Sequence, residues 1–146
     1  MRTGQAARLM QQRVSGGGKE APMTLFHHRE RGTRCLFATE SGAVTIPDLQ
    51  VVVAIVRGEV GYACPELIDL RGASSDFATR QVCGLALWLE DFVKDHVLGP
   101  TAVVVATPVA FGMMRMLETL ASSACTIRPF LNVDDAMRWL QEGAPA

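Results

Sequence analysis

The stretch that decides the fold is TAVVVATPVAFGMMRMLETL, Thr101–Leu120. Its apolar run Ala102–Ala106 is long enough for one buried strand and too short to cross a membrane. Thr107-Pro108 ends the run, and apolar residues then recur at helical spacing, at Val109, Met113, Met116, Leu117 and Leu120. A buried strand that leads directly into an amphipathic helix is half of a βαβ unit. This stretch therefore predicts a parallel β-sheet covered by helices.

Two further strand–helix units flank this stretch. The segment Glu66–Gly72 reads as a buried strand, and a long helix is expected from Asp76 to about Val97. The core-facing residues expected on that helix are Val82, Leu85, Leu89, Phe92 and Val93. After Leu120, Thr126–Leu131 reads as the last strand, and Asn132 is expected to cap a closing helix that runs through Trp139 and Leu140.

The segment before Glu66 reads as two short strands and a helix. Leu25–Arg29 and Arg34–Glu40 are expected to pair around a turn at Arg31-Gly32, and Ser41-Gly42 is expected to turn the chain. A helix is then expected to begin near Pro47, because proline is favoured at the first helical position, and to stop at Gly58. Its Val51–Val53 run has weak helix propensity, so a strand is the alternative here.

Composition sets the class of protein. The chain has 146 residues, of which 49% are hydrophobic and 20% are charged, which fits one soluble globular domain. Its formal net charge of −1 provides no field to attract nucleic acid. No run approaches about 18 apolar residues, so no transmembrane helix is expected. None of the four cysteines forms a CxxC pair, which favours buried free thiols in a reducing cytoplasm.

Residues 1–22 look foreign to this fold, which is expected within residues 23–146. The segment is polar and basic, and Gly16-Gly17-Gly18 would break a helix. A disordered tail and a transit peptide are two interpretations. A third is a mis-called extension, because the codons of Gly18-Lys19-Glu20 can spell a ribosome-binding sequence just before Met23. Residues 23–146 are expected to form a single α/β domain with a mixed, mainly parallel sheet and packed helices.

Four motifs in a fixed order resemble one known family. They are LIDLRGA at Leu67–Ala73, GPTAVVVA at Gly99–Ala106, FGMMRM at Phe111–Met116 and AMRWL at Ala136–Leu140. Together they resemble the bacterial STAS-like family, which is related to the SpoIIAA anti-sigma-factor antagonist and is grouped with the CRAL-TRIO lipid-binding fold. The resemblance covers roughly Met23 to Leu140. It implies a mixed sheet with helices on one or both faces. It does not imply a particular activity, because most members of this branch have no assigned one.

Relatives in this family suggest two kinds of function. STAS-type antagonists bind an anti-sigma kinase and are phosphorylated on a serine at a helix N-terminus. By resemblance, that region corresponds here to Ser74, Ser75 and Asp76, with Arg71 nearby, although the preceding Asp and following Gly of the family pattern are missing. The plain alternative is that the two serines cap a helix. CRAL-TRIO relatives instead carry a lipid in an apolar pocket.

The methionine-rich helix is the expected lining of such a pocket. Its candidate residues are Phe111, Gly112, Met113, Met114 and Met116, although methionines at helical spacing also serve as core filler. Gly112 costs about 1 kcal/mol relative to Ala inside a helix. Either a close approach of this helix to the sheet or backbone access for a ligand would compensate for that cost.

The sequence contains no recognisable catalytic or cofactor motif. Polar residues at the expected carboxyl ends of the strands are Arg71, Ser74, Ser75, Thr107, Asn132 and Asp134, but Gly72 alone cannot make a phosphate-binding glycine loop. His96 lacks a placed nucleophile and is expected to complement a helix C-terminus. No metal-ligand spacing is present.

The sequence therefore predicts a non-enzymatic, cytoplasmic STAS-like module that binds a protein partner, with no cofactor. The alternative is a carrier of a lipid or other apolar small molecule. The first hypothesis expects a filled core and a polar partner surface, and the second expects an apolar cavity of some hundreds of cubic ångströms. A homodimer is compatible with either hypothesis.

Overall fold

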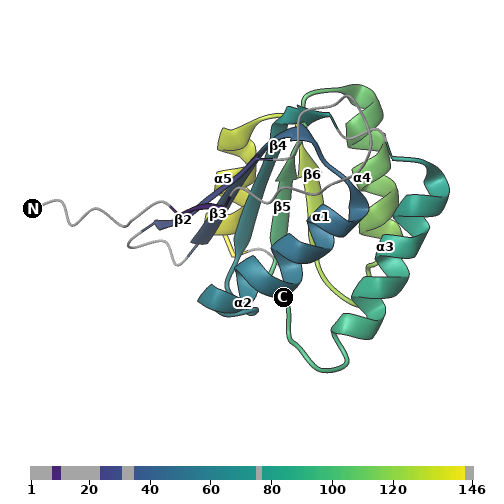
Figure 1. The fold of residues 1–146 in the computed structure, drawn as a ribbon, viewed down its shortest axis with the longest axis horizontal. Coiled ribbons are helices and arrows are strands. Elements are labelled where there is room, and N and C mark those ends of the chain that lie inside the picture. The colour runs from purple at the N-terminus through teal and green to yellow at the C-terminus, as the bar shows by residue number, and fades with distance from the viewer. Residues whose placement is uncertain (1–7, 11–23, 31–34, 75–76, 144–146) are drawn as a thin grey trace, which may run out of the picture.

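The structure is a computed structural model that describes residues 8–10, 24–30, 35–74 and 77–143 (Figure 1). The strands of its single sheet lie side by side in chain order, and their bounds are β1 (Arg8–Met10), β2 (Thr24–Glu30), β3 (Cys35–Ala43), β4 (Glu66–Ser74), β5 (Thr101–Val104) and β6 (Ile127–Phe130). The pairs β1–β2 and β2–β3 are antiparallel, and the remaining neighbours are parallel. The predicted α/β fold with a mixed, mainly parallel sheet is confirmed.

The helices cover the two faces of the sheet unequally (Figure 1). Their bounds are α1 (Ile46–Val51), a π-helical turn η1 (Val52–Val56), α2 (Arg57–Val60), α3 (Thr79–Phe92), α4 (Pro108–Leu120) and α5 (Val133–Gln141). All but α5 lie on one face, and α5 packs on the other. Right-handed crossovers between successive neighbouring strands place their helices on the same face, which explains this asymmetry.

Each face of the sheet has its own hydrophobic core. The larger core joins Ile68, Leu70, Val103 and Ile127 of the sheet to residues of η1, α3 and α4, including Val52, Leu85 and Leu117. The smaller core packs Leu67, Ala102 and Val104 against Ala136 of α5. Strand β5 is therefore buried on both faces, and this explains why its sequence is a continuous apolar run.

The helical segment between β3 and β4 begins as predicted but differs inside. Thr45 caps it, with Asp48 N–H donating to Thr45 Oγ1 at 3.3 Å and Thr45 N–H donating to Asp48 Oδ2 at 2.8 Å. The predicted stop at Gly58 is wrong, because the helix continues to Val60 and ends at Gly61, which has a φ of 118°. The π-helical turn η1 was not predicted, because the sequence indicated a regular helix.

Three other predicted boundaries are wrong. Strand β3 does not turn at Ser41-Gly42 but continues to Ala43, with a register shift that follows Thr39. Helix α3 does not begin at Asp76, because β4 continues as a strand to Ser74 beside β3 and the first helical residue is Thr79. The same helix ends at Phe92 rather than near Val97. Parallel pairing of β3 with β4 therefore extends the sheet into a segment whose sequence suggested a helix cap.

The buried face of α4 also differs from the predicted stripe. Met114 and Leu117 are its buried residues, whereas Val109 is 69% exposed and Leu120 is 41% exposed. This face is turned toward both β6 and α3, which the apolar spacing alone could not specify. Of the predicted N-terminal tail, Arg8–Met10 forms strand β1 against β2, and residues 1–7 and 11–22 lie outside the described residues.

Candidate functional site

The predicted partner surface lies at the carboxyl end of β4. Arg71 is exposed and is held by Asp69 through two side-chain hydrogen bonds, Nε to Oδ1 at 3.0 Å and Nη2 to Oδ2 at 2.9 Å. Burial acts to raise the pKa of Asp69, but its hydrogen bonds and attraction to Arg71 outweigh burial and lower that pKa. Ser74 is exposed at the end of the strand, while Ser75 and Asp76 lie outside the described residues.

The other polar residues expected at this edge act as helix caps. Thr107 Oγ1 accepts a hydrogen bond from Ala110 N–H at 3.1 Å, at the start of α4. Asn132 Oδ1 accepts from the N–H groups of Asp134 and Asp135 at 2.7 and 3.2 Å, as predicted for the start of α5. The parallel strands follow one another in chain order, so this part of the sheet has no point where the strand order reverses and opens a ligand crevice.

Most of the residues predicted to line an apolar pocket do not line the inner cavity of the structure. A cavity of about 50 Å³ lies between the sheet and helices α1, η1, α3 and α4, and of the predicted residues only Met114 lines it. Phe111, Met113 and Met116 are half-buried against the larger core. Gly112 is exposed, and a Cβ atom built there meets nothing within 4 Å, so the predicted close approach to the sheet is wrong.

The most unusual polar group in the described residues is a buried arginine–glutamate pair that the sequence interpretation missed. The side chains of Arg57 and Glu66 are 1% and 0% exposed, and Arg57 Nη1 lies 3.7 Å from Glu66 Oε1. The Arg57 guanidinium donates from Nη1 to Thr101 Oγ1 at 2.7 Å and from Nη2 to the carbonyls of Cys64 and Gly99 at 2.9 and 2.6 Å. These contacts join α2 to the amino-terminal ends of β4 and β5.

The glutamate of this pair is poorly satisfied. Within the described residues, neither carboxylate oxygen of Glu66 has a hydrogen-bond partner, and Arg57 Nε has none. Burial raises the pKa of Glu66 from 4.5 to about 7, although the charge of Arg57 acts to lower it. The pair therefore holds a carboxyl group that changes charge near neutral pH inside the larger core.

The sequence carried a signal for this pair. Arg57 follows Leu49 by eight residues and Val53 by four, which places it on the apolar stripe of its helix. Glu66 shares its strand face with Ile68, two residues later. A charged residue on each of two inward-facing patterns predicts that the two side chains meet in the core, because a lone buried charge is too costly.

Replacing Glu66 with Gln is expected to flatten the pH dependence of stability. The pKa of Glu66 is higher in the folded state than in the unfolded state. The carboxyl group therefore contributes most to the free energy of unfolding below pH 4.5, and this contribution is lost as the pH rises through about 7. The shift corresponds to about 3 kcal/mol of unfolding free energy over that range. Urea unfolding of both proteins between pH 4 and 8 measures it, and equal slopes for the two would contradict the prediction.

Four rings cluster at the C-terminal end of α3. Phe92 stacks between Trp88 and His96, with ring centroids 5.0 and 4.3 Å apart, and Tyr62 contacts Phe92 and His96 edge-on. His96 Nδ1 lies 3.1 Å from the Phe92 carbonyl oxygen, as expected for a residue that complements a helix C-terminus. The Tyr62 hydroxyl donates to the carbonyl of Ala54, in the π-helical turn, at 2.9 Å.

Cys83 and Cys125 are half-buried free thiols. Nowhere in residues 8–10, 24–30, 35–74 and 77–143 do three His, Cys, Asp or Glu side chains group as metal ligands. In that same part of the chain, no helix is long and apolar enough to span a membrane.

In comparisons with known proteins, neither the models of protein families nor the curated protein sequences match this chain.

Proposed function

We propose that the chain is a non-enzymatic, STAS-like module that acts by binding a protein partner in the cytoplasm. The observation that carries the proposal is the filled interior. The cavity between the sheet and the helices measures about 50 Å³, whereas pockets for drug-sized ligands measure about 300–1,000 Å³. A lipid chain of more than about four carbons would have to displace core side chains, so partner binding is favoured over the alternative of an apolar carrier.

The proposed partner surface is the corner where β4 projects beyond β5. The last pair between these strands is Asp69 with Val104, whereas β4 continues beside β3 to Ser74. Arg71 and Ser74 are exposed on this projection, and the Asp69 carboxylate holds the Arg71 guanidinium in one orientation. A fixed guanidinium and an exposed hydroxyl on the same projecting strand are suited to a polar protein surface, and phosphorylation at Ser74 would add about two negative charges to this surface.

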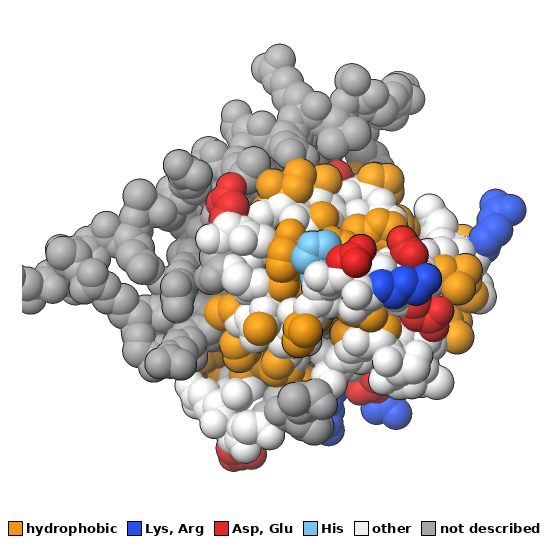
Figure 2. All heavy atoms as spheres, turned by 90° about the horizontal axis from the view of Figure 1, so that it is seen from below, with side chains coloured by type: hydrophobic (Ala, Val, Ile, Leu, Met, Phe, Trp, Pro, Cys, Tyr) orange, Lys and Arg blue, Asp and Glu red, His pale blue; other side chains and the backbone are white. Residues whose placement is uncertain are grey.

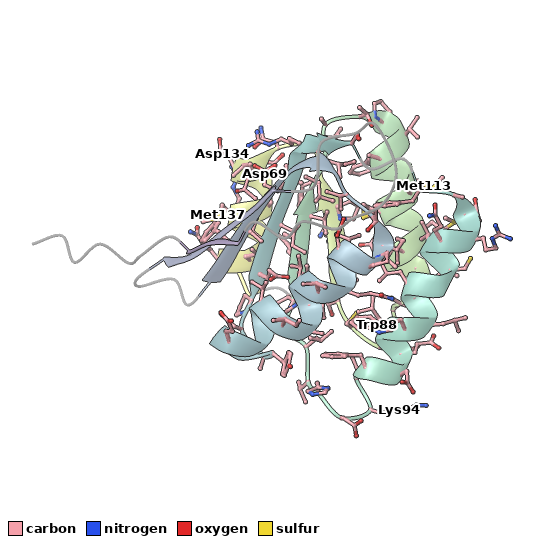
Figure 3. The ribbon with its side chains drawn as sticks, viewed as in Figure 1. Asp69, Trp88, Lys94, Met113, Asp134 and Met137 are labelled. Carbon is pink, nitrogen blue, oxygen red and sulfur yellow. The ribbon has the colours of Figure 1, made fainter. Side chains whose placement is uncertain are left out.

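Site-specific photo-crosslinking in the native host tests this proposal. A photo-reactive amino acid at position 74 is expected to give one discrete protein adduct. The same group at position 94 is the control, because Lys94 is exposed at the opposite end of the molecule (Figure 3). Adducts that are absent at position 74, or equal at the two positions, would contradict the proposed surface.

Native mass spectrometry of the protein from its host separates the two functions. The partner-binding proposal expects the mass of the bare chain, or of a chain with a covalent phosphate. An extra mass of a few hundred daltons that leaves on denaturation would overturn it in favour of the carrier.

A further inference from the structure

A second hollow adjoins the inner cavity at the amino-terminal edge of the parallel strands. It measures about 430 Å³ and lies between the segment that follows α3 and the segment that follows α4. Its walls include His96, Ser122, Ser123 and Thr126. This is the face that Figure 2 shows, where a histidine lies between apolar side chains and acidic side chains. The hollow is distant from the corner of β4, so nothing about it depends on partner binding there.

The outer hollow and the inner cavity share part of their walls. Leu98 and Cys125 line both spaces, and both side chains are half-buried. The inner space is bounded mainly by aliphatic side chains, with Arg57 and Thr101 as its polar members. The outer space has hydroxyl groups and an imidazole. A molecule that occupied both spaces would need an apolar end and a polar end.

The electrostatics of the outer hollow favour a positive polar end. Helices α3 and α4 both end at this hollow, and the carbonyl ends of helices carry partial negative charge. Among the described residues that line it, none is Lys, Arg, Asp or Glu. Asp91 on the last turn of α3 pairs with Lys94, which follows the helix, at 3.3 Å, so their charges largely cancel. Three hydroxyl oxygens can accept hydrogen bonds from a cationic donor.

The inner cavity sets the orientation and the length of the apolar end. Arg57 lines the inner cavity and would repel a cation placed there, so the positive end belongs in the outer hollow. Each group of about the size of a water molecule needs about 10–15 Å³ of such space. A volume of about 50 Å³ therefore accommodates three or four methylene-sized groups.

We propose that this edge of the sheet binds a short-chain primary amine, with its ammonium group in the outer hollow and its alkyl chain in the inner cavity. The ammonium group donates hydrogen bonds to the hydroxyls of Ser122, Ser123 and Thr126. The chain passes between Leu98 and Cys125 to reach the aliphatic walls. An alkyl chain of about four carbons fills the cavity.

An NMR titration of the full chain with n-butylamine tests this site. Saturable amide shifts are expected in residues 96–98 and 122–126. The dissociation constant is expected to be at least tenfold lower than that of butyrate at the same pH, because the carboxylate meets the same helix ends with the opposite sign. Absence of saturable shifts there, or equal affinity for butyrate, overturns the proposal.

The length of the alkyl chain provides an independent check on the unmodified protein. Affinity is expected to rise about fourfold for each methylene from ethylamine to n-butylamine. No further gain is expected for n-hexylamine, because the inner cavity is then full. A continued rise to n-hexylamine places the alkyl chain outside the inner cavity and overturns the assignment.

A matched pair of variants tests the position of the ammonium group. Ser123 is exposed, so substitution there leaves the core intact. Ser123→Asp places a carboxylate in the outer hollow and is expected to strengthen n-butylamine binding about two- to fivefold. Ser123→Asn has the same shape as Ser123→Asp and no charge, and it also replaces the serine hydroxyl, so the gain from the Ser123→Asp carboxylate is measured relative to Ser123→Asn. Equal affinities for the two variants place the ammonium group elsewhere and contradict the proposal.

Discussion

Replacing Arg57 with Ala is expected to lower the free energy of unfolding by about 3–5 kcal/mol at pH 7.5. The substitution removes hydrogen bonds to Thr101 Oγ1 and to the carbonyls of Cys64 and Gly99, and these three acceptors lie near the buried end of the sheet. It also removes the only ion-pair partner of the fully buried Glu66 among the described residues, so the pKa of Glu66 rises further and the carboxyl group shifts toward its neutral form. Urea unfolding monitored by tryptophan fluorescence measures the loss.

The double variant with Glu66→Gln separates the two causes of that loss. If the unpaired charge dominates, Arg57→Ala/Glu66→Gln recovers part of the stability, because the amide carries no charge to bury. The cost of Arg57→Ala is also expected to be smaller at pH 4 than at pH 7.5, since protonation of Glu66 removes the same charge. A loss of less than about 1 kcal/mol at pH 7.5 would show that the pair is not needed for stability.

Replacing Gly99 with Ala is expected to destabilise the fold by about 3 kcal/mol, at the upper end for overpacking. A Cβ atom at this position would overlap the carbonyl oxygen of Ala63 and lie 2.8 Å from its carbonyl carbon. Both groups belong to the backbone and cannot rotate away. Gly99 also donates from N–H to the Tyr62 carbonyl at 3.0 Å and accepts from Arg57 Nη2, so a backbone shift would disturb the buried pair.

Gly112→Ala is the matched control for this substitution. Gly112 lies inside α4, is exposed, and has open space where its Cβ would be. The same chemical change is therefore expected to raise stability by about 0.5–1 kcal/mol through helix propensity. Thermal or urea unfolding of the two variants compares them directly, and destabilisation by both would mean that space at the glycine does not determine the outcome.

In the carboxyl-terminal half, local sequence patterns predicted a buried strand and a helix cap. The run Ala102–Ala106, its end at Thr107-Pro108 and the cap at Asn132 were all predicted from short segments, because strand burial and helix capping depend on neighbouring residues. The Ser74–Asp76 segment failed as a predicted helix cap for the opposite reason. The pairing of Ser74 in β4 with Ala43 in β3 joins residues 31 positions apart, and it overrides the capping preference of the serine.

Some residues of the candidate sites were predicted from the sequence, and others were found only in the structure. Sequence located the exposed Arg71 and Ser74, because both follow a recognisable strand. The contact of Arg71 with Asp69 and the position of both residues beyond the end of β5 came only from the structure. The pair of Arg57 and Glu66 was visible only as two charges on separate apolar patterns.

The sequence by itself determined the α/β class, the succession of strands and helices in the carboxyl-terminal half, the start of α1 near Pro47 and the cap of α5 at Asn132, because periodicity and capping act over a few residues. Only the tertiary structure decided the face that α4 buries, the extension of β4, the π-helical turn and the buried ion pair. Each of these depends on groups far apart in the chain. Arg57 finds Thr101 and Glu66 only when α2 packs against the ends of β4 and β5. That packing minimises the free energy of the whole core rather than of any one segment.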